Sequence, residues 1–294
     1  MQVSANGISL EVDDRGPPDG PPLVMIMGLG MQLVAWPDGL VDLLVERGFR
    51  VIRFDNRDIG LSQRFDHLGV PNLALSGIRH TLGLPVTSPY RLADLADDTA
   101  SLIEAMGLGS AHVCGASMGG MIAQHLAARH PQRVKSLTLM MTTSGARHLP
   151  QPSMKVRLAL MSRPADPRNI DNVVDHFVKL YGVIGSPAYP SPPALLRERI
   201  AASVRRSYRP AATVRQLAAI MADGDRTPLL SRIAAPTLVM HGAADPLVPV
   251  ACGRDLSQRI TGAKLDVIEG MGHDLPQPLW TRFRDGIVKI AARV

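Results

Sequence analysis

The sequence predicts an α/β protein with a mostly parallel central sheet flanked by helices on both faces. Short apolar runs alternate along the chain with longer segments of helical periodicity. The run at 23–27 lies between Pro21-Pro22 and Gly28, as a buried strand would. The alternation stops between residues 144 and 224 and then resumes, which indicates an insertion.

The first part of the chain is expected to form three strands and one helix. Residues 8–12 are expected to form a short edge strand, and 23–27 and 50–54 are apolar runs typical of buried strands. The helix between the last two covers about 37–47, because it can begin at Pro37 and end before Gly48.

The middle of the core repeats this pattern. Pro89 begins a helix that continues to about residue 106, and residues 111–114 form the next strand. A helix over 118–129 and a strand over 134–141 follow. Two further pairs close the chain: the strands cover 237–240 and 265–268, and the helices about 250–260 and 278–292.

Residues 144–224 are expected to be helical with proline-rich joints. Two of the helices each carry one apolar stripe, at residues 170, 173, 174, 177, 178 and 181 and at residues 196, 200 and 204. These stripes could simply pack on the sheet domain. Helices over the carboxyl ends of parallel strands also cover the place where ligands bind, so we expect a helical cap. The core domain is then 1–143 with 225–294.

The chain has 294 residues, of which 46% are hydrophobic and 20% are charged. This composition is that of a soluble, enzyme-sized protein. The N-terminus has no export signal, and no run of eighteen apolar residues occurs. We therefore expect a cytoplasmic protein without membrane insertion. Cys114 and Cys252 have neither disulfide nor metal-ligand spacing and are expected to be buried thiols.

The formal charge of +6 is concentrated in the middle of the chain. Residues 145–232 contain 14 Lys and Arg but only 6 Asp and Glu. No basic tract occurs and aromatic residues are scarce, which argues against nucleic acid as a partner. These cations either form solvated outer helix faces or attract anionic substrates to a cleft.

Ser117 is the candidate nucleophile. It stands in the sequence Gly115-Ala116-Ser117-Met118-Gly119, directly after a predicted strand and before a predicted helix. A sharp strand-to-helix turn with small neighbours exposes the central hydroxyl at the edge of the sheet.

Asp245 and His273 are the candidate partners of Ser117. Asp245 follows the strand at 237–240 in a turn with Pro246, and His273 lies in a glycine-rich loop after the strand at 265–268. A serine hydroxyl needs an imidazole base, and the imidazole needs a carboxylate to fix its tautomer. His241 is expected to satisfy the backbone of the Asp245 turn, and Asp274 to face solvent or cap locally.

The Gly-x-Ser-x-Gly turn, the His-Gly-x-x-Asp turn and the terminal Gly-His loop together resemble the α/β-hydrolase family over nearly the whole chain. The chain order Ser117, Asp245, His273 is the order of that fold. Segments 27–37 and 54–62 resemble the aclacinomycin methylesterase-like branch of serine esterases. The resemblance implies a helical cap after the sixth strand.

The same resemblance assigns the oxyanion hole to the backbone N–H groups of Leu29 and Met118. Many relatives have His-Gly before the first donor, whereas this chain has Met27-Gly28, a change that backbone donors tolerate. Asp55 is ranked below Asp245 as the triad acid, because in relatives the corresponding aspartate holds its own loop. The pocket is expected to include Gly28, Gly30, Met31 and Trp36.

The predicted function is a serine hydrolase that cleaves carboxylic esters of short or medium acyl chains, or methyl esters, through an acyl-enzyme on Ser117. A lactonase, a carbon-carbon bond hydrolase, a perhydrolase or a slow-turnover ligand receptor on the same fold are the alternatives. No metal-ligand cluster and no complete dinucleotide motif occurs, so neither a metal nor a cofactor is expected. The expected partner is a small-molecule ester, and the oligomeric state stays open.

Overall fold

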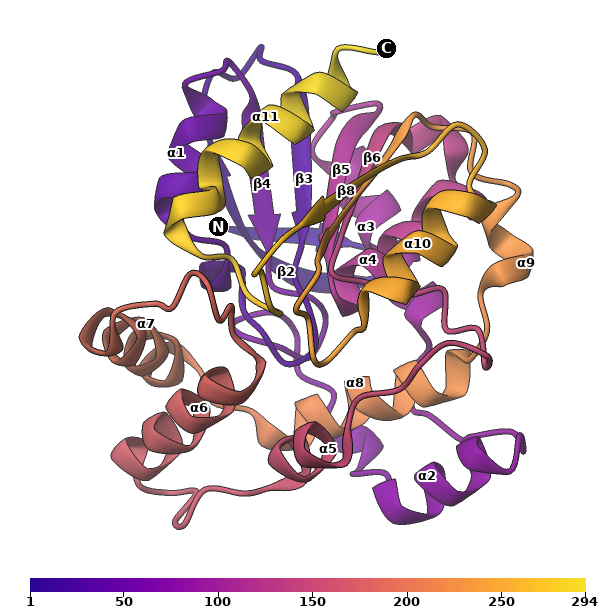
Figure 1. Ribbon diagram of the computed structural model, residues 1–294. Helices are drawn as coiled ribbons and strands as arrows, with labels where there is room; N and C mark the ends of the chain where they lie inside the picture. Colours follow the sequence, from indigo (N-terminus) through magenta and orange to yellow (C-terminus); the bar gives the residue numbers. More distant parts are fainter.

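A computed structural model describes residues 1–294, and eight strands form its single central sheet (Figure 1). The strand order is β1-β2-β4-β3-β5-β6-β7-β8. β1 and β2 pair antiparallel, β2 pairs antiparallel with β4, and all the other pairs are parallel. The strands are β1 (Gln2–Ala5), β2 (Ile8–Arg15), β3 (Pro22–Ile26), β4 (Arg50–Phe54), β5 (Ala111–Ala116), β6 (Val134–Met140), β7 (Thr237–Gly242) and β8 (Lys264–Ile268).

The parallel register aligns the carboxyl ends of the strands at one edge of the sheet. Ile26 of β3 lies opposite Gly115 of β5, and Ala116 lies opposite Met140 of β6. Gly242 of β7 lies opposite Ile268 of β8. The residues that follow β3, β5, β7 and β8 are therefore brought to the same edge.

Helices cover both faces of the sheet, which confirms the predicted fold class. On one face α1 (Asp38–Val45) packs against α11 (Trp280–Ala291), over a core that includes Trp36 and Phe283. On the other face lie α3 (Leu92–Ala105), α4 (Met118–Arg129) and α10 (Val250–Arg259), over a second core that includes Leu139 and Val239. The edge strand β1 was not predicted. It pairs with β2, so the expectation that residues 8–12 form an edge strand was wrong.

The remaining helices lie mainly beyond one end of the sheet (Figure 1). The apolar stripes of α6 and α7 pack against each other around Val174, Ile200 and Ala201, and not against the sheet. The division of the chain into a core and a cap stays a prediction. These helices are α2 (Leu73–Thr81), which sequence reasoning missed, α5 (Met154–Met161), α6 (Ile170–Ile184), α7 (Pro193–Arg206), α8 (Pro210–Asp223) and the short α9 (Thr227–Leu230).

Candidate active site

Ser117 occupies the sharp turn between β5 and α4. Its backbone has φ 54° and ψ −120°, a conformation that residues other than glycine rarely adopt. The Ser117 N–H donates to the Met140 carbonyl (2.9 Å), and the Thr142 hydroxyl donates to the Ser117 carbonyl (2.7 Å). These bonds to the end of β6 hold the strained turn in place.

The glycines around Ser117 are required by close packing. A Cβ atom on Gly119 would lie 2.0 Å from the Ile26 carbonyl oxygen, and one on Gly115 would lie 2.3 Å from the Gly119 carbonyl oxygen. Both distances are far shorter than a van der Waals contact. The small residues of the motif therefore let α4 start directly against the ends of β3 and β5.

His273 joins Ser117 to Asp245. Its Nε2 atom lies 3.1 Å from the Ser117 Oγ atom, and its Nδ1 atom lies 2.7 Å from the Asp245 Oδ2 atom. The three residues follow β5, β7 and β8, so the parallel sheet brings them together across 156 residues of chain. This order of contacts is that of a nucleophile, a base and an orienting acid.

The turn after β7 fixes the Asp245 carboxylate. Its second oxygen, Oδ1, accepts hydrogen bonds from the Leu247 N–H (2.9 Å) and the Val248 N–H (2.8 Å). His241 Nε2 lies 2.7 Å from the Val248 carbonyl oxygen, and burial lowers the pKa of His241. His241 therefore supports the backbone of the turn, as expected, and Asp245 keeps one oxygen for His273.

The loop after β3 passes beside Ser117. A Cβ atom on Gly28 would lie 3.2 Å from the Ser117 Cβ and 3.7 Å from its Oγ. In this loop the Gly30 N–H donates to the side-chain oxygen of Gln216 on α8 (2.9 Å). The N–H groups of Leu29 and Met118 donate to no protein acceptor. Their role as an oxyanion hole stays a prediction.

The other residues of the expected pocket lie in packed surroundings. Gly30 lies against Thr213 of α8, where a Cβ atom would approach the threonine hydroxyl to 2.7 Å. Met31 is partly buried against the core beneath α1 and α11, and Trp36 is wholly buried within that core. A role for these residues in a substrate pocket stays a prediction.

The end of α6 and the residues that follow it form hydrogen bonds with the loop that carries His273. The His273 N–H donates to the Ile184 carbonyl (2.7 Å), and the Gly272 N–H donates to the Ser186 hydroxyl (2.8 Å). The same hydroxyl donates to the Asp274 carboxylate. Asp274 is thus engaged by the insertion, and the expectation that it faces solvent or caps locally was wrong. Burial raises the pKa of Asp274.

α7 and α8 hold the loops that follow β3 and β4. The Gln32 amide nitrogen donates to the carbonyls of Ser203 and Ser207, both at 2.7 Å. Arg206 contacts the Gln32 side-chain oxygen (2.6 Å) and the Asp55 carboxylate (2.7 Å). Asp55 also accepts hydrogen bonds from two backbone N–H groups of its own neighbourhood, at Leu33 and Leu61. Asp55 thus holds loops together, away from His273.

Several of the cations counted between residues 145 and 232 are used in ion pairs. Arg206 pairs with Asp55, and Arg197 with Asp175. Arg215 and Arg226 are both buried and paired with aspartates, Asp58 and Asp223 respectively. The positive charge counted along the sequence is therefore partly structural. No group of three or more His, Cys, Asp or Glu side chains is placed to hold a metal ion, and no helix is both long and apolar enough to cross a membrane.

Residues 21–276 match the family model of the alpha/beta hydrolase fold. The chain belongs to the α/β-hydrolase family. It is 28% identical to the rhodomycin D methylesterase DnrP of Streptomyces peucetius, over 93% of this chain and 92% of that protein. The methylesterase DauP of another Streptomyces is 29% identical over the same shares.

Solved structures agree on the fold. A meta-cleavage product hydrolase from Pseudomonas fluorescens superposes with a TM-score of 0.76 at 20% identity, covering 100% of this chain and 97% of that one. The enol-lactonase from Burkholderia xenovorans superposes with a TM-score of 0.71 at 22% identity, covering 99% and 100%. These structures show the fold. The family match and the methylesterase relatives identify the protein as a hydrolase and support the predicted ester cleavage.

Sequence reasoning missed two residues that touch the site loops, Ser186 and Gln216. Each makes its contact with a residue far away in the sequence, Gly272 and Gly30 respectively. Ser186 was noted only as part of a proline-rich joint, and Gln216 lies in a helix whose contacts no local pattern specifies. Neither position carries a motif that could have revealed it.

Proposed function

We propose that this α/β-hydrolase is a cofactor-independent serine esterase that cleaves small carboxylic esters. The observation that carries the proposal is the continuous contact from Ser117 Oγ through the His273 ring to Asp245. The name of the methylesterase relatives supports methyl esters as substrates, and the proposal also includes esters of short to medium acyl chains.

In the proposed acylation step, Ser117 Oγ attacks the ester carbonyl carbon and its proton passes to His273 Nε2. Asp245 accepts a hydrogen bond from the Nδ1–H group of His273. This contact keeps that proton on the imidazole and stabilises the imidazolium that forms. The carbonyl oxygen becomes an oxyanion. When the tetrahedral intermediate collapses, the alcohol departs with the proton from His273 and leaves an acyl group on Ser117.

The proposed oxyanion donors are the N–H groups of Leu29 and Met118. Both lack a protein acceptor. Met118 directly follows Ser117, and Leu29 directly follows Gly28, which lies beside Ser117, whereas the Gly30 N–H is already bonded to Gln216. Donors aimed in advance at the developing charge contribute about 3 kcal/mol each in other hydrolases. In deacylation, water attacks the acyl carbon, gives its proton to His273, and the acid leaves as Ser117 regains its proton.

The helices from residue 144 to 224 are proposed to act as the cap that shapes the substrate site. This assignment is supported by their contacts with the loops on both sides of Ser117, through Gln216 and through Ser186. A cytoplasmic location remains part of the proposal.

The test compares wild type and Ser117→Ala on a series of p-nitrophenyl esters, together with mass spectrometry after an organophosphonate probe. The proposal expects turnover in the wild type, its loss by at least about a thousandfold in the variant, and the probe on Ser117. Ser257→Ala, a serine on α10, is the control and should keep both turnover and labelling.

Two results would change the proposal. Labelling of Ser117 without ester turnover would favour the lactonase, carbon-carbon bond hydrolase, perhydrolase or receptor alternatives, which share the triad. Turnover that survives in Ser117→Ala would refute the mechanism itself.

A further inference from the structure

The helices α2 and α5 present apolar side chains to solvent. On α2 and just past its end these are Leu75, Ile78 and Leu82, each more than half exposed. On α5 they are Met154, Leu158 and Met161, also more than half exposed. In both helices the spacing places the three side chains on one face.

The two helices belong to one end of the molecule. α2 packs on α8, where the His80 ring lies 3.1 Å from the Met221 carbonyl oxygen. Arg147, in the segment that leads to α5, lies against Gly83 just past α2, since a Cβ there would be 2.6 Å from its guanidinium. Figure 1 shows both helices beyond the same end of the sheet.

We define the α2/α5 surface as the exposed side chains of residues 67–93 and 142–165. Ten of the seventeen exposed large hydrophobic side chains of the protein lie in these two segments. Scattered exposed hydrophobic residues need no explanation, but a concentration in two segments that meet at Gly83 and Arg147 is typical of an interaction surface.

The charged side chains inside the two segments are all cations, and Asp66, Asp94 and Asp166 lie directly beyond the ends of the segments. The two segments contain no Asp or Glu. None of their cations takes part in an ion pair, in contrast to Arg206 and Arg215 in the rest of the insertion. These cations are Arg79, Arg91, Arg147, Lys155, Arg157 and Arg163.

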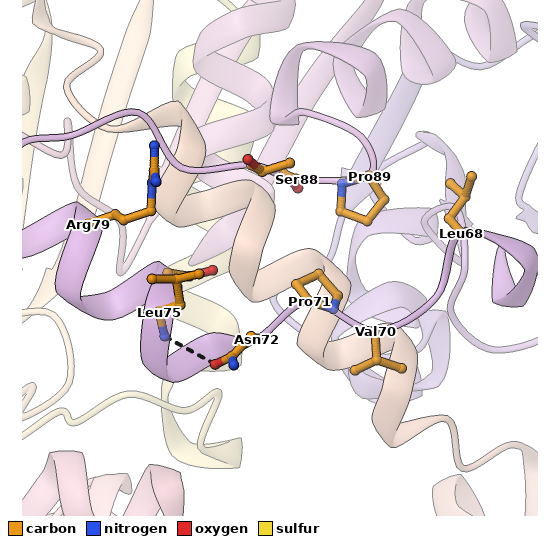
Figure 2. A pocket seen from close by; sticks show the side chains of 10 residues that line it. Leu68, Val70, Pro71, Asn72, Leu75, Arg79, Ser88 and Pro89 are labelled. Carbon is orange, nitrogen blue, oxygen red and sulfur yellow. Dashed lines mark hydrogen bonds between the residues drawn. The ribbon is translucent and has the colours of Figure 1, made fainter.

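A cavity of about 380 Å³ lies in this surface, between α2 and the chain at residues 87–89 (Figure 2). Leu68, Val70 and Leu75 supply apolar walls, and Arg79 lines it as well. The Asn72 side chain accepts from the Leu75 N–H (3.1 Å) and caps the helix at this wall. The cavity places three apolar side chains beside a cation, which suits one acyl chain beside an anionic headgroup.

We infer that the α2/α5 surface binds reversibly to anionic lipid surfaces. Apolar side chains on one helix face enter the boundary between headgroups and acyl chains, while neighbouring Lys and Arg side chains are attracted to lipid phosphates. A second copy of the chain fits less well, because a twofold contact would set this cationic surface against itself. The inference does not depend on the proposed esterase activity.

The first experiment is flotation of the full chain with vesicles of phosphatidylcholine alone and of phosphatidylcholine mixed with phosphatidylglycerol. We expect binding to the mixed vesicles, little binding to pure phosphatidylcholine, and weaker binding as salt is added. Equal binding to both vesicles, or no binding to either at low salt, would overturn the inference.

Three double variants locate the binding surface. Leu158→Asp with Met161→Asp, Ile78→Asp with Leu82→Asp, and Lys155→Glu with Arg157→Glu should each weaken binding at least about tenfold. Leu195→Asp is the control, because Leu195 is exposed on α7 outside the two segments and should bind as wild type does. Circular dichroism of each variant checks that the fold is kept.

Sedimentation velocity separates lipid from a second copy of the chain. A monomer in every variant supports the inference. A dimer that the α5 variants dissociate, together with vesicle binding that they leave unchanged, would assign this surface to self-association and overturn it.

Discussion

The side-chain oxygen of Gln216 accepts a hydrogen bond from the backbone N–H of Gly30 at 2.9 Å, across 186 residues of chain. The other end of the same amide donates to the Arg57 carbonyl (3.3 Å), and the side chain is wholly buried. Gln216 therefore links α8 to the loop that carries the proposed Leu29 donor. The contact fixes the direction of that loop beside Ser117.

Replacing Gln216 by Leu should lower kcat about tenfold to a hundredfold with a smaller change in KM. The Gly30 N–H would lose its acceptor and the loop would shift, which misaligns a donor that acts mainly on the transition state. Steady-state kinetics on a soluble ester measures the split between kcat and KM.

Gln124→Leu is the matched control for this variant. Gln124 is also a wholly buried helix glutamine with both amide atoms bonded, to Thr143 and Arg226. Each substitution should lower the free energy of unfolding by about 1–3 kcal/mol. If both variants lost activity equally, Gln216 would have a structural role only.

Replacing Ser186 by Ala should lower kcat about tenfold, because the loop of His273 loses a hydrogen bond at Gly272 and another at Asp274. Ser186→Thr keeps the hydroxyl and should recover part of the rate. The measurement is kcat and KM on the same ester series.

Ser144→Ala makes the comparison specific. Ser144 is as buried as Ser186 and also donates to a carboxylate, that of Asp255 (2.6 Å), but it does not touch the His273 loop. It should lose stability with little loss of kcat. Equal kcat values for Ser186→Ala and wild type would show that the loop keeps its position without this contact.

Replacing Arg215 by Met should destabilise the fold by about 3–5 kcal/mol, because it leaves the buried Asp58 carboxylate without its charge partner. The Arg215 Nε atom donates to Asp58 Oδ2 (2.5 Å), and its Nη2 atom donates to Asp58 Oδ1 (2.9 Å). Adding Asp58→Asn should restore much of the stability, and asparagine tolerates the φ of 74° at this position. Denaturant unfolding of the single and double variants measures both changes. The idea fails if the double variant is no more stable than the single one.

The protein should become less stable as the pH falls from 6.5 toward 4, partly because of His112. Burial, assisted by the nearby Lys135, lowers the pKa of His112 from 6.5 to about 4. In this window the unfolded chain binds a proton that the folded protein does not, so lowering the pH favours unfolding. The ring is held neutral beside the Ser136 hydroxyl at 2.8 Å.

His112→Asn should have a shallower dependence of the unfolding free energy on pH in this window. Denaturant unfolding at a series of pH values measures the two slopes. Above about pH 7.5 the unfolding free energies of wild type and variant should change with pH in the same way, because His112 is neutral in both the folded and the unfolded state. Equal slopes between pH 4 and 6.5 would exclude His112 as a source of the acid sensitivity.

The core strands, and the meeting of three side chains at one edge of the sheet, could be predicted from sequence because their signals are local. Ser117, Asp245 and His273 each follow an apolar strand, and a parallel sheet brings such positions to one edge. Helix α2 carries helical apolar spacing at Leu75, Ile78 and Leu82, but this stripe is short and sequence reasoning missed it.

Contacts between distant residues could not be predicted in this way. Ser186 reaches Gly272 across 86 residues, and nothing in the surrounding Ser-Pro sequence distinguishes this serine from others in the chain. The stripes of α6 and α7 were visible as periodicity, but periodicity does not say which partner they cover. The structure pairs them with each other.

The separation of Ser117 from His273 by 156 residues also has a consequence for biosynthesis. The ribosome makes the serine long before it makes the histidine, and β8, from which the His273 loop departs, pairs only with β7. A nascent chain would therefore expose the serine without its base until β7 and β8 have joined the sheet. Any product shortened before residue 273 would lack the imidazole that is proposed to receive the serine proton.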